Sequence, residues 1–420
     1  MRVRVFCVFL SLTLLVGLAA LSPLTAQNPT PAAPPAARPA APASRDIAKL
    51  SPLQRQMYLC VQSGADWLHR ANRPDGRFEY GFLPCLKTKL DGDHYLRQVG
   101  AAYALARAAR LTGDERHAAI ARQAVLTLLL DTTTTAAAAN QPAVRHTTLP
   151  SVVVNRLASA GLLVLAINEL TKPADDLLEQ SEALCRFIAK QQQADGSLSY
   201  VDSPAESVDP EGVNFYPGEA LYGLMRSQQY RPAPWKTEVV RKALAYYRPW
   251  WQKHKNMAFV PWQTAAYAEA FVQSQGKEQA YADFIFEMND WMCGLQYTRM
   301  DPRQPLWLGG FMNWVDGGVA AVAPQITSAA YAEGIAEACR TARQAGDVQR
   351  HQRYRESVER CLQFVTTLQY TDANTQHFAD WYRPRLQGGF HASHQDGTLR
   401  IDYAQHAIGA LVQYLTVVAE

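Results

Sequence analysis

The chain has 420 residues, 48% of them hydrophobic and 19% charged, and its formal net charge at pH 7 is +3. No block of basic residues stands out, so the sequence does not indicate nucleic-acid binding. By length alone the chain could form two domains of about 100–200 residues each, but the pattern described below favours a single large one.

The first 26 residues have the pattern of an export signal. Arg2 and Arg4 form a basic start, residues 5–21 are almost wholly apolar, and Ala26 supplies a small residue at a cleavage point. The alternative is an uncleaved membrane anchor, since the apolar run is near the lower limit of about 17–25 residues for a spanning helix. Either way the sequence predicts a secreted or periplasmic protein, with a membrane as partner only if the segment stays attached.

Residues 27–50 form a Pro/Ala-rich linker. Proline fixes the backbone and removes hydrogen-bond donors, so this stretch cannot build a core and is expected to be an extended tether. No second linker interrupts residues 51–420. We therefore predict a signal peptide at 1–26, a linker at 27–50 and one repeat-built domain at 51–420.

Six helix–loop–helix units repeat through that domain. Apolar residues recur three and four positions apart, and Gly, Pro, Asp and Ser mark the helix ends. The predicted helices pair as 51–71 with 93–112, 114–131 with 154–171, 174–193 with 217–229, 235–254 with 261–275, 277–296 with 325–345, and 347–369 with 400–418.

The connections alternate between long and short. The loop within a pair is mostly long, as in 72–92 and 297–324, whereas consecutive pairs are joined by short turns such as those at Gly113 and Gly346. The second helix of each pair is rich in small residues, as a crowded inner barrel requires, and the first carries more charge. Because a closed ring buries the ends that an open stack would expose, we predict an all-α (α/α)6 toroid with every long loop at one end.

Several turns support this architecture. Residues 187–192 (FIAKQQ) with Asp195-Gly196-Ser197-Leu198 resemble the Gln-rich, Asp-Gly-Ser turn repeats of terpenoid cyclases and protein prenyltransferases, and residues 67–78 look like a second copy. Six-hairpin glycosidases, polysaccharide lyases and sugar epimerases are built from the same repeated helical hairpins. Two GGF sequences, at 309–311 and 388–390, indicate tight turns that need positive φ.

The resemblance implies a fold without supplying a reaction. The acidic motifs of terpenoid chemistry are missing, and so is the zinc-binding set of prenyltransferases. We therefore expect no cofactor and no metal, although His391, His394 and His406 leave a weak metal alternative.

Long loops and the N-termini of inner helices should surround one central cavity, where helix N-termini favour anionic ligands. Imidazole, phenol and carboxyl groups near that cavity could transfer protons. The predicted catalytic residues are His94, Tyr95, Glu219, Asp402 and His406. The predicted substrate-binding residues, which include arginines for anions and tryptophans for stacking, are Tyr80, Arg97, His146, Tyr216, Trp262, Gln263, Trp314, Asp316 and Arg400.

Structural interpretations compete with these roles. Glu219 follows Pro217 at the start of a predicted helix, where a Glu often only caps the helix. Asp402 and His406 are one helical turn apart, so they could form an acid/base pair or a structural polar pair.

Three functional hypotheses remain. The leading one is an exported carbohydrate-active toroid that acts on a polysaccharide or uronate-containing glycan by hydrolysis, elimination or epimerisation. The alternatives are a terpenoid-cyclase-like toroid that binds an apolar or isoprenoid ligand, and a non-catalytic surface scaffold. Paired carboxylates would favour hydrolysis. A Tyr/His pair beside Arg without paired acids would favour lyase or epimerase chemistry, and a deep, dry aromatic tunnel would favour the isoprenoid ligand.

Overall fold

A computed structural model describes residues 47–135, 142–201 and 210–419, which belong to one compact unit. The predicted export signal and most of the predicted linker lie outside the described residues. Within the described part of the chain, the helices are too short or too polar to cross a membrane.

The six predicted helical pairs are present in the described residues, with ends close to those expected. The outer and inner helices pair as α1 (Pro52–Ala71) with α2 (Tyr95–Thr112), α3 (Glu115–Leu129) with α4 (Arg156–Glu169), α5 (Asp175–Lys190) with α6 (Tyr216–Ser227), α7 (Pro234–Lys253) with α8 (Phe259–Gln273), α9 (Gln279–Cys293) with α10 (Ser328–Ala345), and α11 (Val348–Thr367) with α13 (Ile401–Gln413). A short helix, α12 (Arg383–Leu386), lies in the last long loop, and a π-helical turn (Tyr414–Val418) follows α13.

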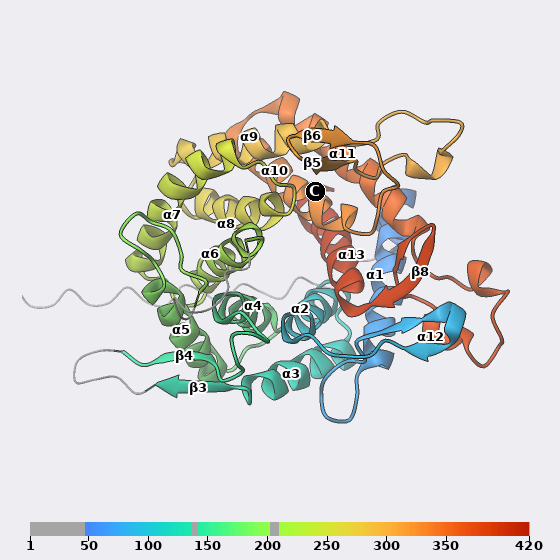
Figure 1. The fold of residues 1–420 in the computed structure, drawn as a ribbon, viewed down its shortest axis with the longest axis horizontal. Helices are drawn as coiled ribbons and strands as arrows, with labels where there is room; N and C mark the ends of the chain where they lie inside the picture. The colour runs from blue at the N-terminus through green and yellow to red at the C-terminus, as the bar shows by residue number, and fades with distance from the viewer. Residues whose placement is uncertain (1–46, 136–141, 202–209, 420) are drawn as a thin grey trace, which may run out of the picture. The chain divides into compact units, whose positions relative to one another are not determined.

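The inner helices close into a ring. Each packs against the next in the order α2, α4, α6, α8, α10 and α13, and α13 packs against α2 again. Figure 1 shows these six helices around the centre and their partners outside them. The predicted (α/α)6 toroid is confirmed.

Small residues make this packing possible. A Cβ added to Gly161 of α4 would lie 2.7 Å from the backbone of Ala220 in α6, and one added to Gly223 of α6 would lie 2.8 Å from the carbonyl oxygen of Gly161. Side chains at these positions would force the two backbones apart. The small residues of the predicted inner helices are therefore a packing requirement.

Four outer helices end in the same turn, in which a side-chain amide bonds a glycine carbonyl. The amides of Asn72, Gln192, Gln296 and Gln369 donate to the carbonyl oxygens of Gly76, Gly196, Gly309 and Gly388. All four glycines have positive φ, between 84° and 94°. In three of them an added Cβ would strike a carbonyl of the next outer helix, at 2.0–2.3 Å, so only glycine fits.

The long loops carry small antiparallel sheets that the sequence pattern did not predict. β1 (Gly81–Leu83), β2 (Thr88–Lys89), β7 (His391–Ser393) and β8 (Asp396–Arg400) form one sheet in the order β2-β1-β8-β7, β3 (Thr132–Thr135) pairs with β4 (Val144–Thr147), and β5 (Asn313–Val315) pairs with β6 (Gly318–Ala320). In the first sheet Gly81 lies opposite Arg400, so the first and last units are joined at the rim.

Candidate active site

A cavity of about 500 Å³ opens at the long-loop end of the ring. All six inner helices contribute to its lining, mostly through their N-terminal turns. Its size lies within the range of small-molecule sites. The predicted residues that line it are His94, Arg97, Tyr216, Glu219, Trp262, Arg400, Asp402 and His406.

Glu219 lies in the first turns of α6 and is buried. It makes no capping hydrogen bond, and its Oε2 atom has no hydrogen-bond partner among the described residues. Burial raises the pKa of this carboxyl to about 8, because the ionised form loses its hydration. Glu219 is therefore mainly protonated at neutral pH and can donate a proton.

His406 lies on α13 and is held by Glu333 of α10. The Nδ1 atom of the imidazole is 2.8 Å from Glu333 Oε2. Burial alone would lower the pKa of His406, but the hydrogen bond and charge of Glu333, with Asp402 nearby, raise it above its usual value. With Nδ1 bonded to Glu333, Nε2 is the ring nitrogen left for proton exchange with a ligand. Asp402, the partner that the sequence suggested for His406, is bonded to Arg400 instead.

Asp402 belongs to a cationic group at the rim of the cavity. Its carboxylate accepts hydrogen bonds of 2.9 and 2.6 Å from Arg400 and lies 3.3 Å from Arg97 Nε. The guanidinium carbons lie over aromatic rings, Arg97 over Tyr80 at 5.5 Å and Arg400 over Tyr403 at 4.4 Å. Two positive charges share one negative charge, so the rim favours an anionic group.

Trp262 of α8 forms part of the cavity wall, next to His406 and to the backbone beside Glu219. Its ring centroid is 6.2 Å from that of His406, and a Cβ added to Gly218, beside Glu219, would lie 2.6 Å from Trp262 Cβ. An indole face in this position suits the apolar face of a ring-shaped ligand.

Three predicted residues on helices or beside the rim do not line the cavity. Tyr95 follows His94 but turns toward α3, where its hydroxyl donates to the Leu128 carbonyl at 2.7 Å. Gln263 follows Trp262, is fully buried, and its amide has no partner among the described residues. Neighbouring helical positions point about 100° apart, which separates each from its cavity-lining neighbour. Tyr80 supports Arg97 from outside the lining.

Three further predicted residues belong to the loop hairpins. His146 lies on β4 and its Nδ1 bonds the Thr147 carbonyl at 2.9 Å. Trp314 lies on β5 and packs against Trp291 with ring centroids 5.4 Å apart. Asp316 occupies the exposed turn between β5 and β6 with φ of 50°. Because these long loops fold into hairpins of their own, they carry the three side chains away from the cavity.

Sequence reasoning missed Glu333, Tyr331 and Tyr403. Tyr331 and Tyr403 line the cavity, and Glu333 lies behind His406. One sequence signal could have indicated Glu333. It is an acidic residue in an inner helix rich in small residues, and Glu337 lies one turn later on the same side of α10.

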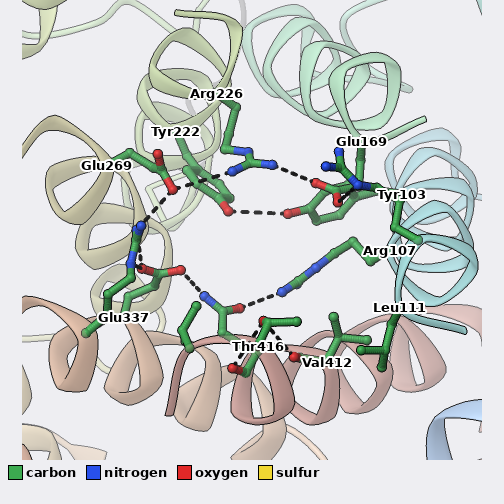
Figure 2. Close-up of a pocket in the computed structure, with 14 residues that line it drawn as sticks. Tyr103, Arg107, Leu111, Glu169, Tyr222, Arg226, Glu269, Glu337, Val412 and Thr416 are labelled. Carbon is green, nitrogen blue, oxygen red and sulfur yellow. Dashed lines mark hydrogen bonds and ion pairs between the residues drawn. The ribbon is translucent and has the colours of Figure 1, made fainter. Parts of the chain in front are cut away.

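The opposite end of the ring holds a smaller cavity of about 190 Å³. Next to it lies a charged belt, which we define as Arg107 and Arg110 of α2, Glu169 of α4, Arg226 of α6, Glu269 of α8, Glu333, Glu337 and Arg340 of α10, and Gln413 of α13. All of them except Glu333 line this cavity. Figure 2 shows most of these side chains converging from different inner helices.

The belt alternates in sign, and its members bond one another. Arg226 bonds Glu169 at 2.9 Å and reaches Glu269 at 3.5 Å, and Arg340 also bonds Glu269 at 2.9 Å. Four arginines face four glutamates, so the charges balance. A cavity of about 20 Å³, bordered by Tyr103, Tyr222 and Trp262, lies between this belt and the large cavity.

Comparison with known proteins identifies the fold. Neither a family model nor a curated protein matches the chain. Among solved structures, it is similar to an unsaturated glucuronyl hydrolase specific for heparin (TM-score 0.57, 12% identity, 86% of this chain and 96% of that one) and to a D-mannose isomerase (TM-score 0.60, 12% identity, 87% and 99%). It is also similar to cellobiose 2-epimerase from Bacillus thermoamylovorans (TM-score 0.54, 10% identity, 83% and 95%). These similarities show that the chain shares the (α/α)6 toroid fold of these proteins.

Proposed function

We propose that the chain is an exported carbohydrate-active enzyme that moves protons on a sugar residue bound in the large cavity. The observation that carries the proposal is the presence of two differently tuned groups in one cavity. Glu219 keeps its proton because it is buried without a partner, and His406 is made more basic by Glu333. A carboxyl group that keeps its proton and an imidazole in the same cavity are the kinds of group that general acid–base catalysis uses.

The dimensions and charge of the cavity suit a terminal sugar. A volume of about 500 Å³ accommodates one or two sugar rings, and Trp262 offers a face for stacking. Arg97 and Arg400 carry more charge than Asp402 neutralises, which favours a ligand with a carboxylate, such as a uronate. The charged lining argues against an isoprenoid ligand, because burying these groups against hydrocarbon would be costly.

The contacts favour proton abstraction from carbon over hydrolysis. Glycoside hydrolysis generally uses two carboxyl groups on either side of the scissile bond. Here both oxygens of Asp402 are bonded to Arg400, and the proposed base in the same cavity as Glu219 is the imidazole of His406. In our mechanism His406 Nε2 removes the proton from the carbon next to a carbonyl or carboxylate, while Glu219 gives its proton to the oxygen that gains negative charge.

The outcome then depends on where the protons go next. Return of a proton to the opposite face of the same carbon gives an epimer, and its return to the neighbouring carbon gives an isomer. Loss of a leaving group from the adjacent carbon gives an unsaturated uronate. The solved structures with similar folds include an isomerase and an epimerase that act on sugars by name, which supports this class of chemistry for the chain.

A panel of sugars in deuterated water tests the proposal. Purified protein should be incubated with reducing sugars and uronate-containing oligosaccharides and followed by NMR, by the ultraviolet absorbance of unsaturated uronates and by new reducing ends. We expect deuterium to enter at the carbon next to the carbonyl or carboxylate, or unsaturated product to appear, and Glu219→Gln to abolish either signal. New reducing ends without deuterium or unsaturation would instead establish hydrolysis.

Export is a separate part of the proposal and rests on residues 1–26. Expression of the full chain with a C-terminal tag in a bacterium, followed by fractionation, tests it. We expect the mature protein outside the cytoplasm with its N-terminus near residue 27, and a cytoplasmic full-length product would contradict this.

A further inference from the structure

Arg107 connects the charged belt with the proposed active site. It lies on α2 and is almost completely buried. One arm of its guanidinium, Nη2, donates to Gln413 Oε1 at 2.8 Å, and the other arm, Nη1, donates to Glu333 Oε1 at 3.2 Å. Its Cζ atom also lies 5.4 Å from the centre of the Tyr103 ring. The side chain is thus fixed on three sides.

Glu333 divides its two oxygens between Arg107 and His406. Oε1 accepts from Arg107 and Oε2 bonds the imidazole Nδ1 at 2.8 Å. A carboxylate held at one oxygen by a rigid planar donor has little freedom to turn the other oxygen away. The orientation of Glu333 toward His406 is therefore set from the side opposite the ligand.

Gly409 supplies the room for this arrangement. It lies on α13, three residues after His406, and a Cβ there would be 1.9 Å from Glu333 Oε1 and 3.1 Å from Arg107 Nη1. Glycine costs about 0.5–1 kcal/mol relative to alanine inside a helix, so its presence here needs a reason. The Arg107–Glu333 bond occupies the space that a side chain would fill.

We propose that Arg107 is a positioning residue for His406: it holds Glu333 so that its second oxygen faces the imidazole, and Gly409 keeps the space for that bond. Arg107 itself does not line the large cavity. The inference rests on the proposed role of His406, but the structural part can be measured without a substrate.

The groups around His406 determine whether its pKa should rise or fall when Arg107 is replaced. The groups around the imidazole are Glu333 of α10, Asp402 of its own helix, Arg97 of α2 and the uncharged Trp262 of α8. If Arg107 acted only through its charge, removing it would raise the pKa of His406. If Arg107 holds Glu333 in place, its loss frees the carboxylate, burial then dominates, and the pKa falls.

The experiment measures the pKa of His406 by NMR in the full chain labelled at histidine, with His406→Ala to assign the signal. We expect Arg107→Gln and Gly409→Ala both to lower this pKa by roughly one unit or more. Arg107→Lys keeps the charge but lacks the two donor arms of the guanidinium, so the pKa of His406 in this variant should lie between those of Arg107→Gln and the wild type. The matched control is Arg110→Gln, which removes a belt arginine one turn away that faces Glu169 at 3.6 Å, and it should leave the pKa unchanged.

An unchanged or raised pKa in Arg107→Gln overturns the proposal. Gly409→Ala provides a second test if Arg107→Gln does not fold, since alanine favours the helix and its Cβ would displace Glu333 Oε1, the atom that accepts from Arg107. Once a substrate is known, both variants should lower kcat with little change in KM. If no sugar is turned over by the wild-type protein, the proposed function fails while the pKa shifts still decide the role of Arg107.

Discussion

The two ends of the helical ring use polar residues in opposite ways. At the long-loop end, Glu219 has no partner at Oε2 among the described residues, and it lines the large cavity together with His406. At the short-turn end, arginines and glutamates of the charged belt bond one another around a cavity less than half that size. The same six helices build both ends.

The direction of the inner helices explains the contrast. Their N-termini converge at the large cavity and supply positive potential there, whereas their C-termini converge beyond the belt and supply negative potential. Arginines near helix C-termini offset that potential, and glutamates between them balance the charge. We therefore expect the belt to be structural, and the large cavity to hold its polar groups at a cost in stability.

The largest expected effect is at the large cavity. His406→Ala should lower turnover of any substrate found by roughly 10²–10⁴-fold, because it removes the proposed general base. Circular dichroism should show unchanged helicity. Unaltered turnover would remove His406 from the mechanism and leave the two ends without a functional difference.

The next effect is expected in the belt. Glu269→Gln leaves Arg226 and Arg340 buried beside a neutral side chain, and we expect a loss of about 3–5 kcal/mol in the free energy of unfolding. Urea denaturation measures it. The matched control is Glu238→Gln on the exposed face of α7, which breaks a pair with Arg241 and should leave the stability nearly unchanged. A stable Glu269→Gln protein would show that the belt is not structural.

A pH-dependent effect sharpens the comparison further. Glu219 ionises at its usual pKa in the unfolded chain but keeps its proton up to about pH 8 in the folded one. The unfolded state therefore releases the proton first, and the stability contributed by Glu219 falls as pH rises through that window. Glu219→Gln should gain stability relative to wild type between about pH 5 and about pH 8. Urea denaturation at about pH 5 and about pH 8 measures this. The same difference in midpoint between Glu219→Gln and wild type at both pH values would contradict the raised pKa of Glu219.

The smallest effect concerns the loop hairpins. Trp314→Ala, on β5, should change turnover by less than about twofold, because Trp314 packs against Trp291 away from the large cavity. Trp262→Ala is the contrasting variant and should raise KM roughly tenfold through lost stacking. A larger loss in Trp314→Ala than in Trp262→Ala would show that the hairpins reach the substrate.

The fold could be predicted from the sequence because its signals are local. Periodic apolar residues, glycine stops and alternating loop lengths define the hairpins, and the small residues at Gly161 and Gly223 mark the inner helices. The placement of Trp314 and His146 could not be predicted, because short hairpins inside long loops depend on pairings that have no helical period. Glu333 and Arg107 were missed because their partners lie on other helices, 73 and 226 residues away.

The pairing of β1 with β8, which joins Gly81 to Arg400, also bears on how the protein folds. It connects segments from opposite ends of the domain, and contacts so distant in sequence carry a large loop-closure entropy, which slows folding. His406 lies six residues after this joint, on the last helix. The large cavity, which His406 lines, therefore needs both ends of the domain in place, and we expect it to be complete only when the ring has closed.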